Sequence, residues 1–353
     1  MSALVLLLTT TAASVALLHA SDSLCTRALA AAPDLSCAEA GRGVALAATP
    51  EEAARLAGYA RAAEARFAAQ FGRDIAPYVV ISTPPVPQRA ALSATGFTHI
   101  LPWPALRTFD EAARRGVEQG TRRFAASQNM TPAQTEDVVA RALSQIPDAK
   151  AQAALDAGMV PHELGHLWFT QAFWPQRAST DADAPHHYGG PGPDWLDEAA
   201  AVVLEDEATA AQRRDQFRAL MRGETVPAVG PIDGRSLLLD LPGLLSREHP
   251  GLARAVAAAP DVAASGGIGV SFTPAGAGPR PAALERVFYI QTRVFADYLI
   301  QTSGRPTILA EIAEALASGR SFEAWLTSQG AAHGLPASIP DLQKGWRAYA
   351  ERQ

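Results

Sequence analysis

Five consecutive residues, His162-Glu163-Leu164-Gly165-His166, have the types and the spacing needed for metal-assisted hydrolysis. Side chains four positions apart share one face of a helix, so the two imidazoles can bind one ion together. Zn2+ prefers neutral nitrogen donors, and hydrolysis needs a base beside the water on the metal. The segment therefore predicts a Zn2+ site with His162 and His166 as ligands and Glu163 as the general base.

A third ligand is predicted in the segment Trp195–Ala201, which reads W-L-D-E-A-A-A. The segment follows a run of glycine and proline, and Asp194 can cap a helix that we expect from Trp195 to Arg213. Glu198 would lie in the first turn, before small alanines that allow another helix to approach. Two histidines and one glutamate leave a fourth position for water, which is typical of catalytic rather than structural zinc.

The H-E-L-G-H and W-L-D-E-A-A-A segments together resemble the gluzincins, the superfamily of thermolysin and the membrane alanyl-type aminopeptidases. More narrowly, they resemble the bacterial peptidase MA-like domains. The resemblance implies that His162, His166 and Glu198 bind zinc and that Glu163 takes a proton from the attacking water.

The linker between the two segments departs from this resemblance. Thirty-one residues separate His166 from Glu198, where the aminopeptidases have fewer. The extra length, Phe173–Asp194, is rich in Pro, Gly, Asp and His and is expected to be a loop near the cleft. Its His186 and His187 are alternatives to Glu198, which we prefer because its helix context matches the resemblance.

Other hydrolase signatures are absent. A metzincin needs Gly and His where this chain has Phe169 and Ala172, so that class is excluded. The G-x-M-E-N segment that the aminopeptidases use at the substrate amine is missing. No G-x-S-x-G elbow supports a serine hydrolase.

A second catalytic residue is suggested near the C-terminus. A helix is expected from Glu285 to the stop at Gly304, and Tyr298 lies on its apolar stripe as a core residue. Tyr289-Ile290-Gln291-Thr292 resembles the Y-x-Q-[ST] form of peptidase MA-like chains. The resemblance implies that Tyr289 donates a hydrogen bond to the oxyanion. The alternative, that Tyr289 only packs at a helix interface, stays open.

The whole chain is expected to be α+β, a mostly helical zincin-like fold with a small N-terminal sheet and a helical C-terminal lobe. With 353 residues, of which 48% are hydrophobic, it can bury a large core. We expect a signal peptide at 1–20, an N-terminal segment at 21–48 and a gluzincin-like domain at 49–353. Its N-lobe would span about 49–172 and its C-lobe about 173–353.

Several elements around the motif can be read from caps and periodicity. Pro161, directly before His162, either opens the zinc helix or kinks a longer helix that begins near Ala151. Further helices are expected at Pro50–Phe71, Phe109–Gln119 and Pro132–Leu143, and also in the C-terminal region after Gly304. Strands are expected at Pro77–Ser82 and Phe97–Leu101.

The N-terminus predicts export. Ala3–Leu18 is an uncharged apolar run, and cleavage of a signal peptide is expected near Ala20, with an uncleaved membrane anchor as the alternative. The protein would be periplasmic or secreted. Cys25 and Cys37, the only cysteines, are then expected to form one disulfide rather than remain two free thiols.

These observations favour an exported zinc metallopeptidase, an endopeptidase acting on a peptide or protein substrate. One alternative is a catalytically inactive zincin-fold envelope protein that binds peptides or proteins, and another is a helical envelope protein with an accidental motif. A net charge of −6 and the lack of a basic cluster exclude a nucleic-acid partner. Membrane contact is expected only if the N-terminal segment stays uncleaved. His99, His249 and His333 are interpreted as structural or solvated.

Overall fold

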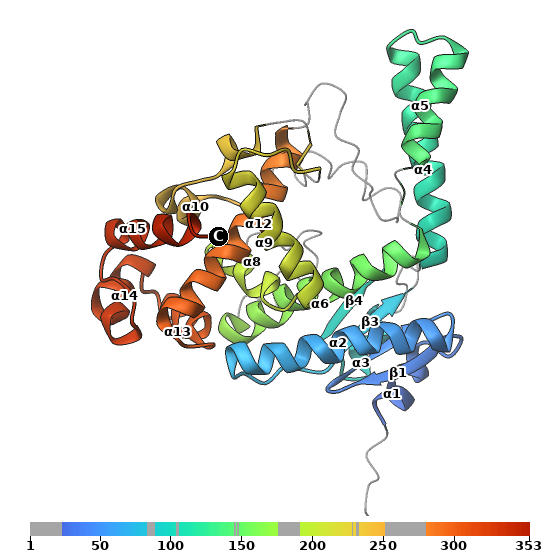
Figure 1. The fold of residues 1–353 in the computed structure, drawn as a ribbon. Helices are drawn as coiled ribbons and strands as arrows, with labels where there is room; N and C mark the ends of the chain where they lie inside the picture. Colours follow the sequence, from blue (N-terminus) through green and yellow to red (C-terminus); the bar gives the residue numbers. More distant parts are fainter. Residues whose placement is uncertain are drawn as a thin grey trace, which may run out of the picture.

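The structure is a computed structural model, and helices predominate in it. The part of the chain that it describes comprises residues 23–82, 89–103, 106–144, 146, 148–175, 191–227, 229–230, 233–250 and 280–353. Within these ranges the strands form one small sheet near the N-terminus, which confirms the predicted mostly helical α+β class (Figure 1).

The sheet has the order β1-β2-β3-β4 and combines antiparallel and parallel pairs. β1 (Ser36–Ala40) pairs antiparallel with β2 (Gly43–Ala47), and β2, β3 (Tyr78–Ser82) and β4 (His99–Pro102) are parallel. β3 and β4 match the two expected strands. β1 and β2 were not expected, and they place part of the segment before residue 49 inside the sheet.

Helices cover both faces of this sheet. α1 (Leu24–Ala31) and α3 (Arg89–Ala94) lie on one face, and α2 (Pro50–Phe71) and α6 (Ala149–Phe173) lie on the other. A disulfide between Cys25 and Cys37 joins α1 to β1, as predicted.

The motif helix α6 is one helix of 25 residues with Pro161 in its interior. The longer of the two alternatives is therefore correct, and Asp148 caps its start by accepting a hydrogen bond from the backbone of Ala151. Trp168 of α6 packs against Tyr78 and Phe67, with ring centroids 5.1 and 5.7 Å away. By helical arithmetic this contact turns the face with the two motif histidines away from the sheet.

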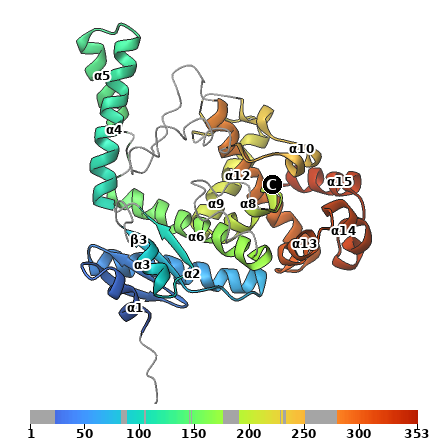
Figure 2. The ribbon, with the colours of Figure 1, turned by 180° about the vertical axis from the view of Figure 1, so that it is seen from behind.

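A second group of helices lies over that face of α6 (Figures 1 and 2). The expected single helix from Trp195 to Arg213 is wrong, because the chain forms α8 (Asp194–Val202) and α9 (Glu207–Met221). The side chain of Asp206 accepts a hydrogen bond from the backbone N–H of Thr209 and so caps the start of α9. This cap favours a new helix here over continuation of α8.

The C-terminal helices complete this half of the molecule. The buried α12 (Arg280–Ser303) packs on α8 and α9, and Gly304 ends it as predicted. The remaining elements are η1 (Gly234–Leu237), α10 (Leu241–Ser246), α13 (Ile308–Ala317), α14 (Phe322–Gln329), η2 (Gly330–His333) and α15 (Ile339–Ala350).

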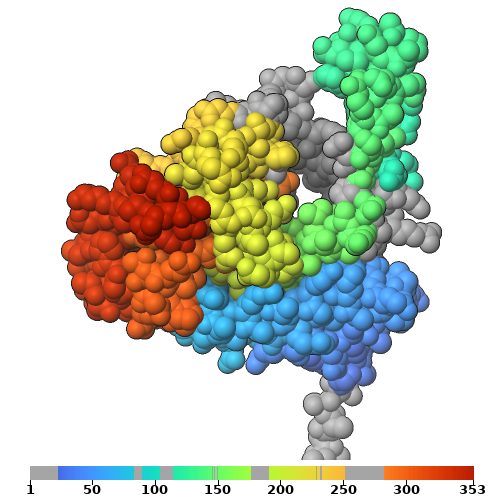
Figure 3. Space-filling view, viewed as in Figure 1, coloured from blue at the N-terminus to red at the C-terminus, as the bar shows by residue number. Residues whose placement is uncertain are grey.

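Two helices, α4 (Leu106–Ser127) and α5 (Pro132–Ser144), lie apart from the sheet and from the C-terminal helices. They form a hairpin that extends from the body near the start of α6, and α4 is longer than expected (Figure 3). Among the described residues, no helix has the length and apolar character needed to cross a membrane. The expected signal peptide at 1–20 and the loop histidines His186 and His187 lie outside the described residues.

Candidate metal centre

The helix α6 places His162 and His166 one turn apart, on the face turned toward α8. Their Nε2 atoms are 3.3 Å apart, and the two residues are only 2% and 6% exposed. Two nitrogen ligands of one tetrahedral zinc ion are separated by roughly 3.4 Å, given zinc–nitrogen bonds of about 2.0–2.1 Å. The imidazole pair therefore has the spacing of two ligands on one ion.

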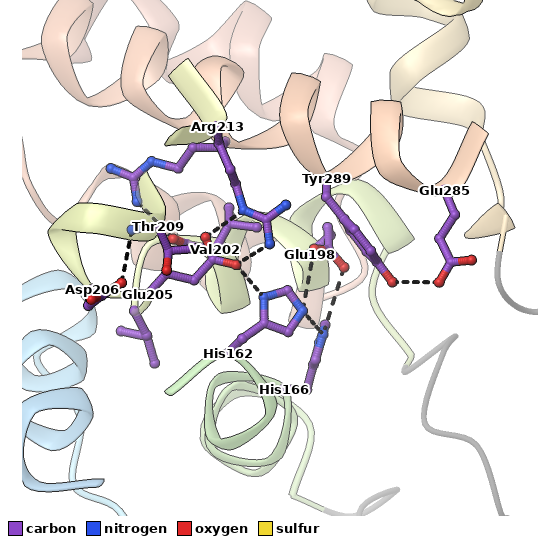
Figure 4. Close-up of polar contacts among 12 residues, drawn as sticks. His162, His166, Glu198, Val202, Glu205, Asp206, Thr209, Arg213, Glu285 and Tyr289 are labelled. Carbon is purple, nitrogen blue, oxygen red and sulfur yellow. Dashed lines mark hydrogen bonds and ion pairs between the residues drawn. The ribbon is translucent and has the colours of Figure 1, made fainter. Parts of the chain in front are cut away.

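The close approach of α8 brings Glu198 to this pair. A Cβ atom on Gly165 would lie 2.8 Å from the Cα of Ala201, so only glycine in the motif allows α8 this near. Glu198 Oε1 lies 3.5 Å from His162 Nε2, and Oε2 lies 3.7 Å from His166 Nε2. One atom from each of the three residues lies within 4.8 Å of the others, so these side chains form a candidate metal-binding group (Figure 4).

The carboxylate of Glu198 is the strongest sign that a cation belongs here. Its side chain is completely buried, and neither oxygen accepts a hydrogen bond from any described residue. Burying an ionised carboxylate costs several kcal/mol unless cations or donors compensate it, and the groups that face Glu198 are imidazoles at 3.5–3.7 Å. Two imidazole nitrogens and one carboxylate are donors that zinc prefers, and the set fits the ion.

Each motif histidine is held from behind by another carboxylate. His162 Nδ1 lies 2.9 Å from Glu205 Oε1. The buried guanidinium of Arg213 donates to both oxygens of Glu205. His166 Nδ1 lies 3.0 Å from Asp197 Oδ2. These contacts place the Nδ1 protons toward the carboxylates and direct both Nε2 atoms toward Glu198, the tautomer that a metal requires.

The charges of the centre shift the pKa values of its groups. Burial by itself would lower the pKa of His166, but the carboxylates of Asp197 and Glu198 outweigh it and raise this pKa to about 10. Burial would raise the pKa of Glu198, whereas the surrounding imidazoles lower it to about 2. Glu198 is therefore ionised at neutral pH, and a metal ion that binds here displaces a proton from His166.

Glu163 lies beside the ligand pair on α6. Its side chain is half-buried, and no hydrogen bond joins it to another residue in the described part of the chain. Its charge contributes to the raised pKa of His166, so the carboxylate lies near this imidazole. This arrangement leaves Glu163 available to a water molecule or a substrate.

Tyr289 of α12 packs against the site with its ring. The ring centroid is 5.8 Å from that of His162, and the guanidinium of Arg213 lies over the Tyr289 ring at 5.4 Å. The hydroxyl donates to Glu285 Oε1 at 3.0 Å, and Figure 4 shows it turned toward that residue. The structure therefore places Tyr289 beside the ligands, with its hydroxyl engaged along its own helix.

Four residues of the centre were not singled out in the sequence. Asp197 precedes Glu198 directly and could have been noticed. Glu205, which contacts His162 and is paired with Arg213, lies at the break between α8 and α9, which the sequence did not indicate. His249, interpreted as structural or solvated, is buried and therefore not solvated, and its Nε2 atom lies 3.6 Å from Glu198 Oε2. It lies in the loop after α10, where no local pattern marks it.

The other two histidines lie outside the centre. His99 contacts Gln171, and His333 Nδ1 lies 2.8 Å from Glu311 Oε2.

Comparison of the chain with models of protein families, with curated proteins and with solved structures finds no match. Inferences about activity therefore rest on the residues and their geometry.

Proposed function

We propose that this protein is a zinc-dependent metallopeptidase of the gluzincin type. The observation that carries the proposal is the buried carboxylate of Glu198, which faces the imidazoles of His162 and His166 and accepts no hydrogen bond from a described residue. These three residues would hold the ion. A bound zinc ion lowers the pKa of a water ligand toward neutrality and polarises a substrate carbonyl.

Glu163 would act as the general base and then as the general acid. It accepts a proton from the attacking water and passes it to the amine that leaves when the peptide bond breaks. Its position on α6 beside the ligands, with a half-buried side chain, supports this role.

Tyr289 would stabilise the oxyanion by donating its hydroxyl proton in a hydrogen bond. The contact of its ring with His162 supports a place at the reacting carbonyl. In this role the hydroxyl would turn from Glu285 toward the substrate.

A peptide or protein substrate follows from the resemblance of the two motif segments to gluzincins. Export is part of the proposal, because disulfides such as Cys25–Cys37 persist in oxidising compartments. Together with the apolar N-terminal run, the disulfide supports a periplasmic or secreted protein.

The proposal is tested by measuring metal and activity in the same preparation. Protein purified without added zinc should contain about one zinc per chain and cleave a casein or peptide library. Chelation should abolish cleavage, and added zinc should restore it. Absence of stoichiometric metal would mean that the motif is accidental. Metal without cleavage would instead favour an inactive zincin-fold protein that binds peptides.

A further inference from the structure

A third imidazole, that of His249, contacts the carboxylate of Glu198. His249 Nε2 lies 3.6 Å from Glu198 Oε2, close to the distances at which the two motif histidines lie from the same carboxylate. The side chain of His249 is 3% exposed. An imidazole this close to a buried carboxylate stabilises its negative charge.

The structure holds His249 in place from its backbone and from its ring. Its backbone N–H donates to the carboxylate of Asp194, the first residue of α8. Its ring packs against Phe288 and Tyr289 of α12, with both centroid distances at 5.4 Å. The helix that carries Glu198 therefore also fixes the loop that carries His249.

His249 does not belong to the candidate metal-binding group itself. The group whose donor atoms lie within 4.8 Å of one another contains His162, His166 and Glu198. His249 contacts the carboxylate at Oε2, which also lies 3.7 Å from His166 Nε2, whereas Oε1 is the oxygen nearest to His162. The contact at 3.6 Å is an ion-pair distance, longer than a hydrogen bond.

We infer that His249 is a positioning residue that engages one oxygen of Glu198, so that this ligand binds the metal through its other oxygen. A glutamate that can bind through either one or both oxygens alters the number of metal–ligand bonds. Engaging one oxygen keeps the carboxylate monodentate and leaves a coordination position for water or substrate. This inference rests on the proposed zinc site.

Cobalt provides a readout that does not depend on activity. Co2+ occupies zinc sites, and its visible absorption reports the number and geometry of its ligands. His249→Ala should bind Co2+ about 10- to 100-fold more weakly, the usual effect of removing a residue that orients a ligand. Its absorption should also change, because Glu198 is then able to bind through both oxygens.

Conservative variants separate positioning from general damage to the fold. His249→Gln places an amide N–H near the position of Nε2 and should restore most of the affinity and the wild-type spectrum. His249→Asn carries the same amide on a side chain one methylene shorter, so it should restore neither the Co2+ affinity nor the wild-type spectrum. If His249→Ala does not fold, the comparison of the Gln and Asn variants decides the matter. His333→Ala, which alters a histidine–glutamate pair outside the centre, should leave the spectrum unchanged.

The outcomes distinguish this inference from the proposed function. A wild-type protein that binds no metal would overturn both. A wild-type protein that binds metal and cleaves peptides, with His249→Ala equal to it in Co2+ affinity and spectrum, would overturn only the role of His249. X-ray absorption showing three imidazoles on the metal in the wild type would also overturn it, because His249 would then be a ligand.

Discussion

The candidate metal centre and the α4–α5 hairpin both contain several ionised groups, but the two regions differ in how far water reaches those groups. On the hairpin, Arg122 pairs with Glu118 at 2.9 Å and with Glu136 at 2.6 Å, and all three side chains are at least 42% exposed. In the centre, Glu198 and Glu205 are fully buried. Water solvates the charges of the hairpin, whereas the centre excludes water from its carboxylates.

This difference separates charges that water solvates from charges that the fold itself must compensate. Exposed ion pairs contribute little to stability, because water competes for each partner and salt screens them. A buried carboxylate without donors destabilises the fold unless a cation compensates it. The hairpin can therefore lose its pairs at little cost, while changes in the centre should have large effects on metal and activity.

Replacing the proposed base should give the largest effect. Glu163→Gln should lower kcat/KM by about 10²- to 10⁴-fold, the usual contribution of a general base, while the protein still binds one zinc. Peptide hydrolysis and elemental analysis would measure the two quantities. Glu136→Gln on the hairpin is the matched control and should retain full activity. An active Glu163→Gln variant would contradict the proposed base.

The carboxylate behind His162 should matter to the metal. Glu205→Gln removes the charge that orients this ligand and should weaken zinc binding by about 10- to 100-fold in a competition titration with a chelator. Glu311→Gln is the control. Glu311 pairs with His333 outside the centre, so this variant should bind zinc as the wild type does. Equal affinities of both variants would refute the orienting role of Glu205.

The motif glycine should matter to stability. A methyl group at Gly165 meets the backbone of Ala201, and such overpacking costs about 1–3 kcal/mol. Alanine has a higher helix propensity than glycine, which offsets up to about 1 kcal/mol of this cost. Gly165→Ala should therefore lower the free energy of unfolding by about 1 kcal/mol.

A second glycine supplies the control for this prediction. Gly58 of α2 has no atom within 4 Å of the added methyl group, so Gly58→Ala should raise the free energy of unfolding by up to about 1 kcal/mol. Denaturant titration of both variants measures the difference. A stabilised Gly165→Ala would show that α6 and α8 are not in close contact.

The hairpin should show the smallest effect. Arg122→Ala removes two exposed ion pairs, and the free energy of unfolding should hardly change, because water and salt already weaken such pairs. Thermal unfolding at low and high salt measures the change. A large loss of stability or of activity in Arg122→Ala would contradict the view that the charges of the hairpin matter less than those of the centre.

Elements whose signals lie within one helical turn could be predicted from the sequence. Thr49 caps α2 by accepting from the backbone of Glu52, and Gly72 ends the helix with φ near 59°. Both features depend on neighbours along the chain, so their sequence pattern is sufficient. The same is true of the H-E-x-x-H pair, because helical spacing alone places its histidines on one face.

Elements that depend on distant partners could not be predicted in this way. β1 and β2 are short and rich in alanine, and they become strands because β3 pairs with β2 in parallel. Similarly, the break between α8 and α9 turns Glu205 toward His162, and nothing in the expected single helix indicated it.

By itself, the sequence determined that His162 and His166 share one face of one helix, because that relation extends over four residues. It also determined that a disulfide could form, since only two cysteines are present. The tertiary structure decided which carboxylates reach the imidazoles and that His249, 51 positions after Glu198, contacts the same ligand. These contacts arise from the packing of α6, α8 and α12, whose geometry no local pattern encodes.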